Sequence, residues 1–306
     1  MGGSCSLRID SEDDADVEKA AVAAEAEVRR LERKFSRFLP DSLVTAINNA
    51  AGLGRFIPID SETEGLLNFA DTLWQQSGGL FDPTSGVLRQ AWDFRSDKLP
   101  RQDSLDRLLP LVGWERVQRG PGSVYLPQTG MELDLGGYVK EYAADAAASV
   151  LRSHGMTNAL VDLAGDMQAV SSQGNGEAWR IGIRSPGNGD QAVGGLDLTE
   201  AGLASSGNYE RCINLNGKRY GHILDPHTGW PVEGLAAVSV SASQCLVAGG
   251  IATIAMLLPA DKALCWITDL GVPFLAVDAD QRVVVQGMDT KAELAETFHE
   301  SLRWLS

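Results

Sequence analysis

The chain has 306 residues, of which 44% are hydrophobic and 22% charged, and its formal net charge at pH 7 is −15. This composition is typical of globular proteins, and no segment approaches the ~18 consecutive apolar residues of a membrane span. The negative field repels nucleic-acid backbones and no basic stripe interrupts it. We therefore predict a soluble protein with no nucleic-acid partner and no direct membrane insertion.

The cysteines and the first residues bear on the compartment. Cys5, Cys212, Cys245 and Cys265 have neither CxxC nor zinc-like spacing, which favours buried, reduced thiols. The opening MGGSCSLRID has no basic region followed by an apolar core, as a secretory signal would. We therefore expect a cytoplasmic protein.

The first half of the chain predicts a strand and two long helices. The strand lies in the opening segment, and residues 12–35 then place apolar side chains at alternating steps of four and three after an acidic start, which is typical of an amphipathic helix. A second helix is predicted from a capping box that begins at Ser61, and it ends at Ser77-Gly78-Gly79. A leucine-rich helix follows near residue 104, and then a hairpin around Gly120-Pro121-Gly122.

The second half mixes strands with two further helices. We predict helices over 137–153 and 247–258, and strands over 159–163, 167–171, 178–184 and 238–243. Helices and mostly hairpin-linked strands together indicate an α+β fold. No repeat or linker divides the chain, so we expect one domain over 1–306, possibly built from two intimate subdomains.

The segment MELDLGGYVKEYAAD is the first candidate for chemistry. We expect Asp134 to end a strand, Gly136-Gly137 to make a turn, and Lys140 to lie in the first turn of the next helix. A phosphate at such a helix start would meet backbone N–H groups and an ammonium group. An ordinary strand–turn–helix corner is an equal alternative, because Gly-Gly before a helix is common.

Two other segments supply a candidate acid–base group and aromatic rings. Asn216-Gly217 predicts a hairpin whose second strand delivers His222 and Asp225. An imidazole can take a proton from a hydroxyl near neutral pH, although a histidine that is only packed is the commoner case. The turn FDPTSG, followed by Trp92 and Phe94, could stack a planar ring or could simply belong to the core.

The order of these motifs resembles one known family over essentially the whole chain. FSRFLPDS, FDPTSG, LDLGGYVK, LVDLAGDM, SSGNY, HILDPHTG and AGGIATIAML are similar to the ApbE family of FAD:protein FMN transferases. The resemblance implies an ApbE-like fold of mostly antiparallel sheets with packed helices and a central flavin cleft. It also implies that an acceptor threonine of a redox protein attacks the FMN phosphorus of FAD with Mg²⁺ present, and that AMP is released.

The resemblance also implies roles for individual residues. His222 would help to deprotonate the acceptor hydroxyl. Mg²⁺ would be held by the backbone carbonyl of Gly137 and by Thr253. Contacts with FAD would come from Met1, Phe38, Leu80, Phe81, Asp82, Asp134, Lys140 and Leu224.

Two positions depart from the family pattern. Gly249 stands where the family commonly has a metal-binding aspartate, four residues before Thr253. Glu141 follows the lysine where the family usually has glycine; we favour a solvated helix glutamate over the alternative that Glu141 supplies the missing charge. Two other functions therefore stay open: hydrolysis of the FAD pyrophosphate to FMN and AMP, and a non-catalytic FAD-binding pseudoenzyme.

Overall fold

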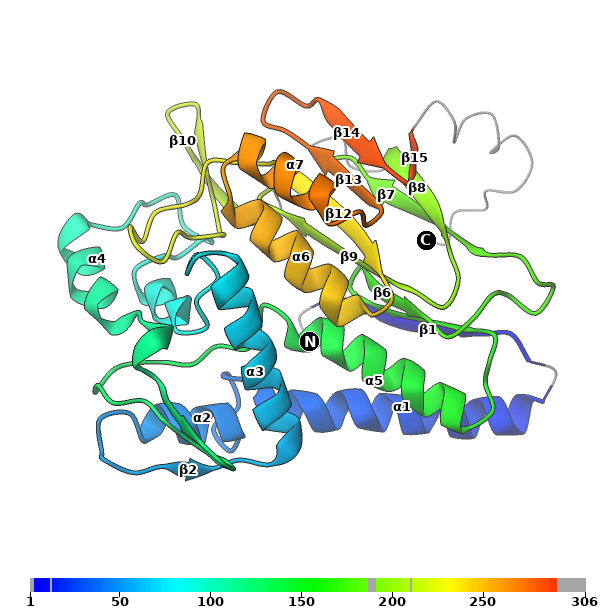
Figure 1. The fold of residues 1–306 in the computed structure, drawn as a ribbon, viewed down its shortest axis with the longest axis horizontal. Helices are drawn as coiled ribbons and strands as arrows, with labels where there is room; N and C mark the ends of the chain where they lie inside the picture. The colour runs from blue at the N-terminus through cyan, green and yellow to red at the C-terminus, as the bar shows by residue number, and fades with distance from the viewer. Residues whose placement is uncertain (1–2, 12, 187–190, 210, 291–306) are drawn as a thin grey trace.

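A seven-stranded antiparallel sheet forms the centre of the molecule (Figure 1). The structure is a computed structural model that describes residues 3–11, 13–186, 191–209 and 211–290. Each neighbouring pair of strands in this sheet is antiparallel. Its strands, in spatial order, are β1 (Cys5–Ile9), β5 (Ala159–Leu163), β6 (Asp166–Ala169), β9 (Gly202–Gly207), β12 (Ala237–Ala242), β13 (Phe274–Val277) and β14 (Val283–Gln286).

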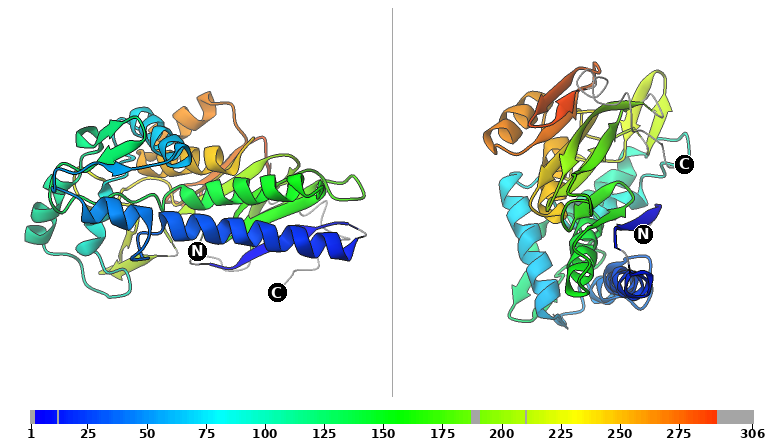
Figure 2. Two further views of the ribbon diagram at one scale, coloured as in Figure 1. Left: turned by 90° about the horizontal axis from the view of Figure 1, so that it is seen from below. Right: turned by 90° about the vertical axis from the view of Figure 1, so that its right-hand side faces the viewer.

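Helices cover one face of this sheet. Helix α5 (Val139–Ser153) packs on β5 and β6, and α6 (Cys245–Leu257) packs on β9 and β12. Helix α1 (Asp14–Phe35) lies along α5, as Figure 2 shows from below. Small residues line the buried side of α6, among them Ala248, Gly249 and Ala252. They allow α6 to approach α5 closely, and this contact later bears on the site.

The opposite face of the central sheet packs on a three-stranded sheet. This second sheet consists of β7 (Trp179–Arg184), β8 (Ala192–Leu198) and β15 (Asp289–Thr290) in the order β15-β8-β7. Leu160, Leu203 and Leu275 of the central sheet join Trp179 and Leu196 in one buried cluster. Apolar residues on both faces of the central sheet are therefore removed from water.

Shorter elements flank this core. The helical ones are α2 (Leu43–Asn49), α3 (Ser61–Gln76), η1 (Ser85–Gln90), α4 (Gln102–Leu108), η2 (Leu109–Leu111), η3 (Trp114–Arg116) and α7 (Ala260–Asp269). A small sheet has the order β2 (Ile57–Pro58), β4 (Ser123–Tyr125), β3 (Gln118–Gly120), and β10 (Cys212–Leu215) pairs with β11 (Lys218–Gly221).

The predicted fold class is confirmed, with small shifts at the ends of elements. The four long helices and both predicted hairpins are present, and Asn216 of the second hairpin has a positive φ of 52°, as a tight turn requires. The predicted cap of α3 is wrong by one residue. Asp60, not Ser61, occupies the N-cap, where its carboxylate accepts hydrogen bonds from the backbone N–H (3.0 Å) and the hydroxyl (2.7 Å) of Thr63.

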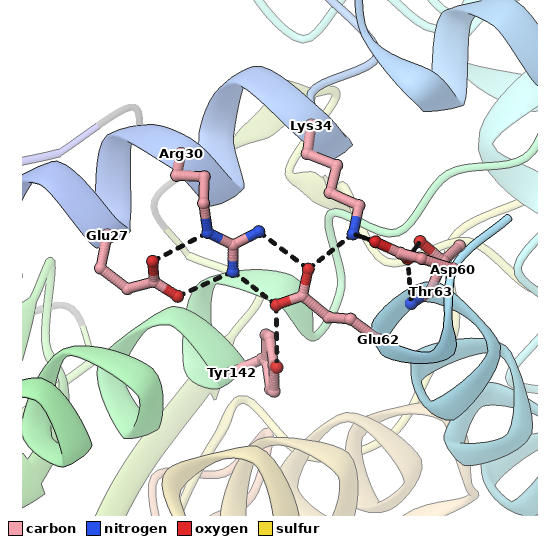
Figure 3. Close-up of polar contacts among 7 residues, drawn as sticks. All are labelled: Glu27, Arg30, Lys34, Asp60, Glu62, Thr63 and Tyr142. Atoms are coloured by element: carbon pink, nitrogen blue, oxygen red, sulfur yellow. Dashed lines mark hydrogen bonds and ion pairs between the residues drawn. The ribbon is translucent and has the colours of Figure 1, made fainter.

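An ion-pair network, which we call the α1–α3 network, joins these two helices (Figure 3). It consists of Glu27, Arg30 and Lys34 on α1 and of Asp60 and Glu62 at the start of α3. The two oxygens of Glu62 accept hydrogen bonds from Arg30 at 2.5 and 2.9 Å, from Lys34 at 2.6 Å, and from Tyr142 of α5 at 3.1 Å. Both carboxylate oxygens of Glu62 are thus fully engaged.

The cysteine prediction is only partly correct. Cys245 is buried, but Cys5 and Cys265 are exposed and Cys212 is half-buried. All four thiols are free. In the described part of the chain, no helix is both long and apolar enough to cross a membrane, and the cytoplasmic location stays a prediction.

Candidate functional site

The segment from Met131 to Leu135 belongs to no helix or strand, so the prediction that Asp134 ends a strand is wrong. Its backbone hydrogen bonds go to other groups. The Asn48 amide donates to the carbonyl of Leu133 at 3.0 Å and accepts from its N–H at 2.7 Å, and the N–H of Asp134 donates to Pro83 at 2.8 Å. These contacts fix the approach to α5 without a neighbouring strand.

Asp134 lies at the turn before α5 and has a cationic partner that the sequence did not reveal. Its carboxylate pairs with Arg37 and accepts a hydrogen bond from the N–H of Gly136 at 2.9 Å. Burial lowers the pKa of Arg37, while Asp134 acts in the opposite direction. A Cβ atom at Gly86 would lie 2.5 Å from the Cβ of Asp134, so only glycine allows the FDPTSG turn to come this close.

Lys140 lies in the first turn of α5 and pairs with Asp166 at the start of β6. The side chain of Asp166 is only 2% exposed and also accepts a hydrogen bond from the N–H of Ser205 at 3.0 Å. Burial alone would lower the pKa of Lys140, but the carboxylates of Asp166 and Glu141 raise it above its usual value. Lys140 therefore carries a positive charge at neutral pH.

Glu141 is buried, with 8% of its surface exposed, so the favoured prediction of a solvated glutamate is wrong. Its side chain extends to α6, where a Cβ atom at Gly249 would lie 2.6 Å from the Cγ of Glu141. Burial and the neighbouring Asp166 carboxylate raise the pKa of Glu141 well above its usual value, against the opposing effect of Lys140.

His222 lies just beyond β11, which ends at Gly221, so the strand itself does not carry it as predicted. Its ring is half-buried and meets Phe94 edge-on, with centroids 6.4 Å apart. Phe94 in turn stacks on Trp92 at 5.2 Å. Leu224 makes an isolated β-bridge with Pro231. The predicted aromatic surface of the 81–94 segment therefore reaches His222.

The remaining predicted FAD contacts lie in different environments. Phe38 is 78% exposed, Leu80 is half-buried and Phe81 is buried. Asp82 is also buried, and its oxygens accept hydrogen bonds from the N–H (2.7 Å) and hydroxyl (2.5 Å) of Thr84 and from the N–H of Trp114 (3.0 Å). Met1 lies outside the described residues.

The 81–94 segment links the α5 corner to His222. Pro83 accepts the hydrogen bond from Asp134, Phe81 lies within 3.7 Å of the Cβ position of Gly137, and Phe94 contacts His222. Cavities of about 500 and 300 Å³ are lined by none of Asp134, Lys140 and His222, although Asp82 lines the smaller one. These predicted site residues are thus connected through one shared segment.

Sequence reasoning missed three polar residues of this region. Asn48 holds the 131–135 segment, Arg37 pairs with Asp134, and Asp166 pairs with Lys140. Arg37 lies in the motif FSRFLPDS, and Asp166 lies in the motif LVDLAGDM. The motifs therefore contained both charged residues, but the sequence did not indicate which ion pairs they form.

Comparison with known proteins agrees with this architecture. The crystal structure of the ApbE protein from Thermotoga maritima superimposes with a TM-score of 0.82 at 27% identity, covering 96% of each chain. The apo flavinyl transferase ApbE from Pseudomonas stutzeri gives 0.82 at 27% identity, covering 99% of this chain and 95% of its own. The fold is therefore that of the flavin transferases of known structure.

Sequence relatives identify the family. A curated protein of Treponema pallidum named FAD:protein FMN transferase is 30% identical over 92% of this chain and 84% of its own length. One of the same name from Haemophilus influenzae is 29% identical over the same shares. The family model described as the ApbE family matches residues 1–275. The chain belongs to the ApbE family and is an enzyme of the transferase class.

Proposed function

We propose that the chain transfers the FMN moiety of FAD to a threonine hydroxyl of an acceptor redox protein and releases AMP, in a reaction that depends on Mg²⁺. The observation that carries the proposal is the family match over residues 1–275, which includes the corner with Lys140 and the half-buried His222. The curated relatives are named for this transfer. We treat residues 1–306 as one domain.

The proposed reaction is a phosphoryl transfer. The threonine oxygen forms a bond to the FMN phosphorus, the bond from that phosphorus to the bridging pyrophosphate oxygen breaks, and AMP leaves with that oxygen. His222 accepts the hydroxyl proton. Lys140, which carries its charge at the start of α5, offsets the negative charge of the pyrophosphate. The aromatic residues near His222 present ring faces to the flavin.

The residues present fit a hard divalent cation. We propose that the carbonyl of Gly137 and the hydroxyl of Thr253 help to hold Mg²⁺, which when bound neutralises charge on the pyrophosphate oxygens. Within the described residues no group of three or more His, Cys, Asp or Glu side chains is arranged for a metal. Glu141 nevertheless brings a buried carboxylate to the side of Gly249. Mixed oxygen ligands of this kind suit Mg²⁺.

The predicted flavin contacts belong to the same proposal. Phe38, Leu80, Phe81, Asp82, Asp134 and Leu224 lie on segments that meet near the α5 corner or beside His222. Because the oxygens of Asp82 are occupied by Thr84 and Trp114, we propose that Asp82 acts by holding the turn next to Phe81.

The test is incubation with FAD, Mg²⁺ and a threonine-bearing acceptor protein of a characterised relative. We expect a fluorescent acceptor band and one AMP released for each flavin attached. His222→Asn should slow the transfer by about 10²- to 10⁴-fold and leave FAD binding unchanged. Free FMN without a labelled acceptor would identify the hydrolase, and FAD binding without AMP release would identify the pseudoenzyme.

A further inference from the structure

Glu141 and Gly249 occupy complementary positions on two packed helices. A Cβ atom at Gly249 would lie 2.6 Å from Cγ, 3.1 Å from Cδ and 3.1 Å from Oε1 of Glu141. Real side chains do not approach so closely, so the carboxyl group of Glu141 fills the space into which a side chain at position 249 would extend. The side chain that α6 lacks at position 249 is thus replaced in space by the Glu141 side chain of the neighbouring helix α5.

One carboxylate oxygen of Glu141, Oε2, is buried and accepts no hydrogen bond from the residues that the structure describes. Lys140, the nearest candidate partner in sequence, is engaged by Asp166. A buried carboxylate oxygen without a donor is costly, because it loses its hydration and makes no hydrogen bond in return. A cation would remove that cost.

The helix geometry directs Glu141 toward the other proposed ligands. Side chains on a helix lean toward its N-terminus, so Glu141 leans toward Gly137, four residues earlier. Thr253 lies four residues after Gly249 and thus on the same face of α6. Glu141 therefore leans toward the turn that contains Gly137, and it faces the side of α6 that carries Gly249 and, one turn later, Thr253.

We propose that Glu141 is a relocated metal ligand, which binds the divalent cation in place of the aspartate that position 249 lacks. This inference rests on the proposed function and adds to it the carboxylate that completes the set with Gly137 and Thr253. One carboxylate replaces another on the opposite helix, so the charge presented to the cation is conserved. Gly249 is then a requirement of the arrangement, because any side chain there would displace Glu141.

Direct cation binding tests the inference without relying on turnover. Free Mn²⁺ is measured by electron paramagnetic resonance while the protein, with FAD present, is titrated with Mn²⁺. We expect one site in the native protein and at least a tenfold loss of Mn²⁺ affinity in Glu141→Gln, which keeps the shape of the side chain and removes its charge. Glu62→Gln, which neutralises a carboxylate of the α1–α3 network, is the matched control and should change the affinity far less.

A second experiment moves the carboxylate from α5 back to α6. Glu141→Gly alone should lose Mn²⁺ binding, and Gly249→Asp alone should be misfolded or bind Mn²⁺ more weakly because the introduced side chain would clash with Glu141. The double variant Glu141→Gly/Gly249→Asp should regain Mn²⁺ binding to within a few-fold of the native affinity. Equal affinity in the native protein and in Glu141→Gln would overturn the relocation, while FMN transfer could persist. A native protein that binds no Mn²⁺ with FAD present would overturn both the relocation and the proposed function.

Discussion

Two glutamates, Glu62 and Glu141, show how differently one residue type is used in this fold. Glu62 sits in the α1–α3 network with donors on both oxygens, and its pairing with Arg30 lowers its pKa to about 2 (Figure 3). Glu141 is buried, one of its oxygens has no hydrogen-bond partner in the described part of the chain, and burial raises its pKa. A satisfied carboxylate fixes helices in place, whereas an unsatisfied buried one has an oxygen that can accept a ligand.

The largest difference in stability should come from removing one lysine beside Glu141, Lys140, and one lysine of the α1–α3 network, Lys34. Lys140→Met leaves Asp166, 2% exposed, without its cation, and we expect it to lower the free energy of unfolding by about 3–5 kcal/mol. Lys34→Met should cost only about 1–2 kcal/mol, because Glu62 keeps Arg30. Urea denaturation of both variants measures the difference, and equal losses would contradict the contrast between the two regions.

Neutralising each glutamate should separate stability from function. Glu62→Gln weakens a saturated network, so we expect it to lower the free energy of unfolding by about 2 kcal/mol and to leave the rate of AMP release within twofold. Glu141→Gln should leave the stability unchanged or slightly raised, since it removes a buried charge, and should slow AMP release. Chemical denaturation and an AMP assay on the same samples give both quantities. A stability loss in Glu141→Gln as large as that in Glu62→Gln would refute the distinction.

The α1–α3 network should also make stability depend on pH. The pKa of Glu62 is about 2 in the folded protein, against an ordinary value of 4.5, so its stabilisation is present above pH 4.5 and is lost as the pH falls toward 2. With solvent screening, we expect the loss to be on the order of 2 kcal/mol. Urea midpoints between pH 2 and 5 should fall more steeply in the native protein than in Glu62→Gln. Parallel slopes would show that Glu62 is not the titrating group.

The smallest effect concerns the cap of α3. Asp60→Ala removes the acceptor for Thr63 and should cost about 1 kcal/mol, while Ser61→Ala should stay within about 0.5 kcal/mol. Thermal melting of the two variants decides between Asp60 and Ser61 as the cap. A greater cost for Ser61→Ala would restore the cap that the sequence predicted.

Local patterns predicted the long elements, whereas non-local contacts decided the rest. The apolar spacing over 12–35 predicted α1 within two residues, because helix periodicity depends only on near neighbours. The segment around Asp134 was wrongly predicted as a strand end, because its backbone partners, Asn48 and Pro83, come from distant parts of the chain.

The candidate site shows the same difference between local sequence patterns and non-local contacts. Motif resemblance predicted Lys140 and Thr253, but the burial of Glu141 depends on a facing glycine on α6, which no pattern around Glu141 reveals. Sequence alone therefore predicted a candidate site without showing how its charges pair. The packing of α5 on α6 supplied that information.

A crystal structure of the protein with FAD and Mn²⁺ would show directly whether Glu141 is a metal ligand, because the anomalous signal locates the metal. We expect one peak at the start of α5, within coordination distance of the Glu141 carboxylate, the Gly137 carbonyl and the Thr253 hydroxyl. A peak bound by other residues, with the Glu141 carboxylate turned away from it, would show that Glu141 is not a ligand.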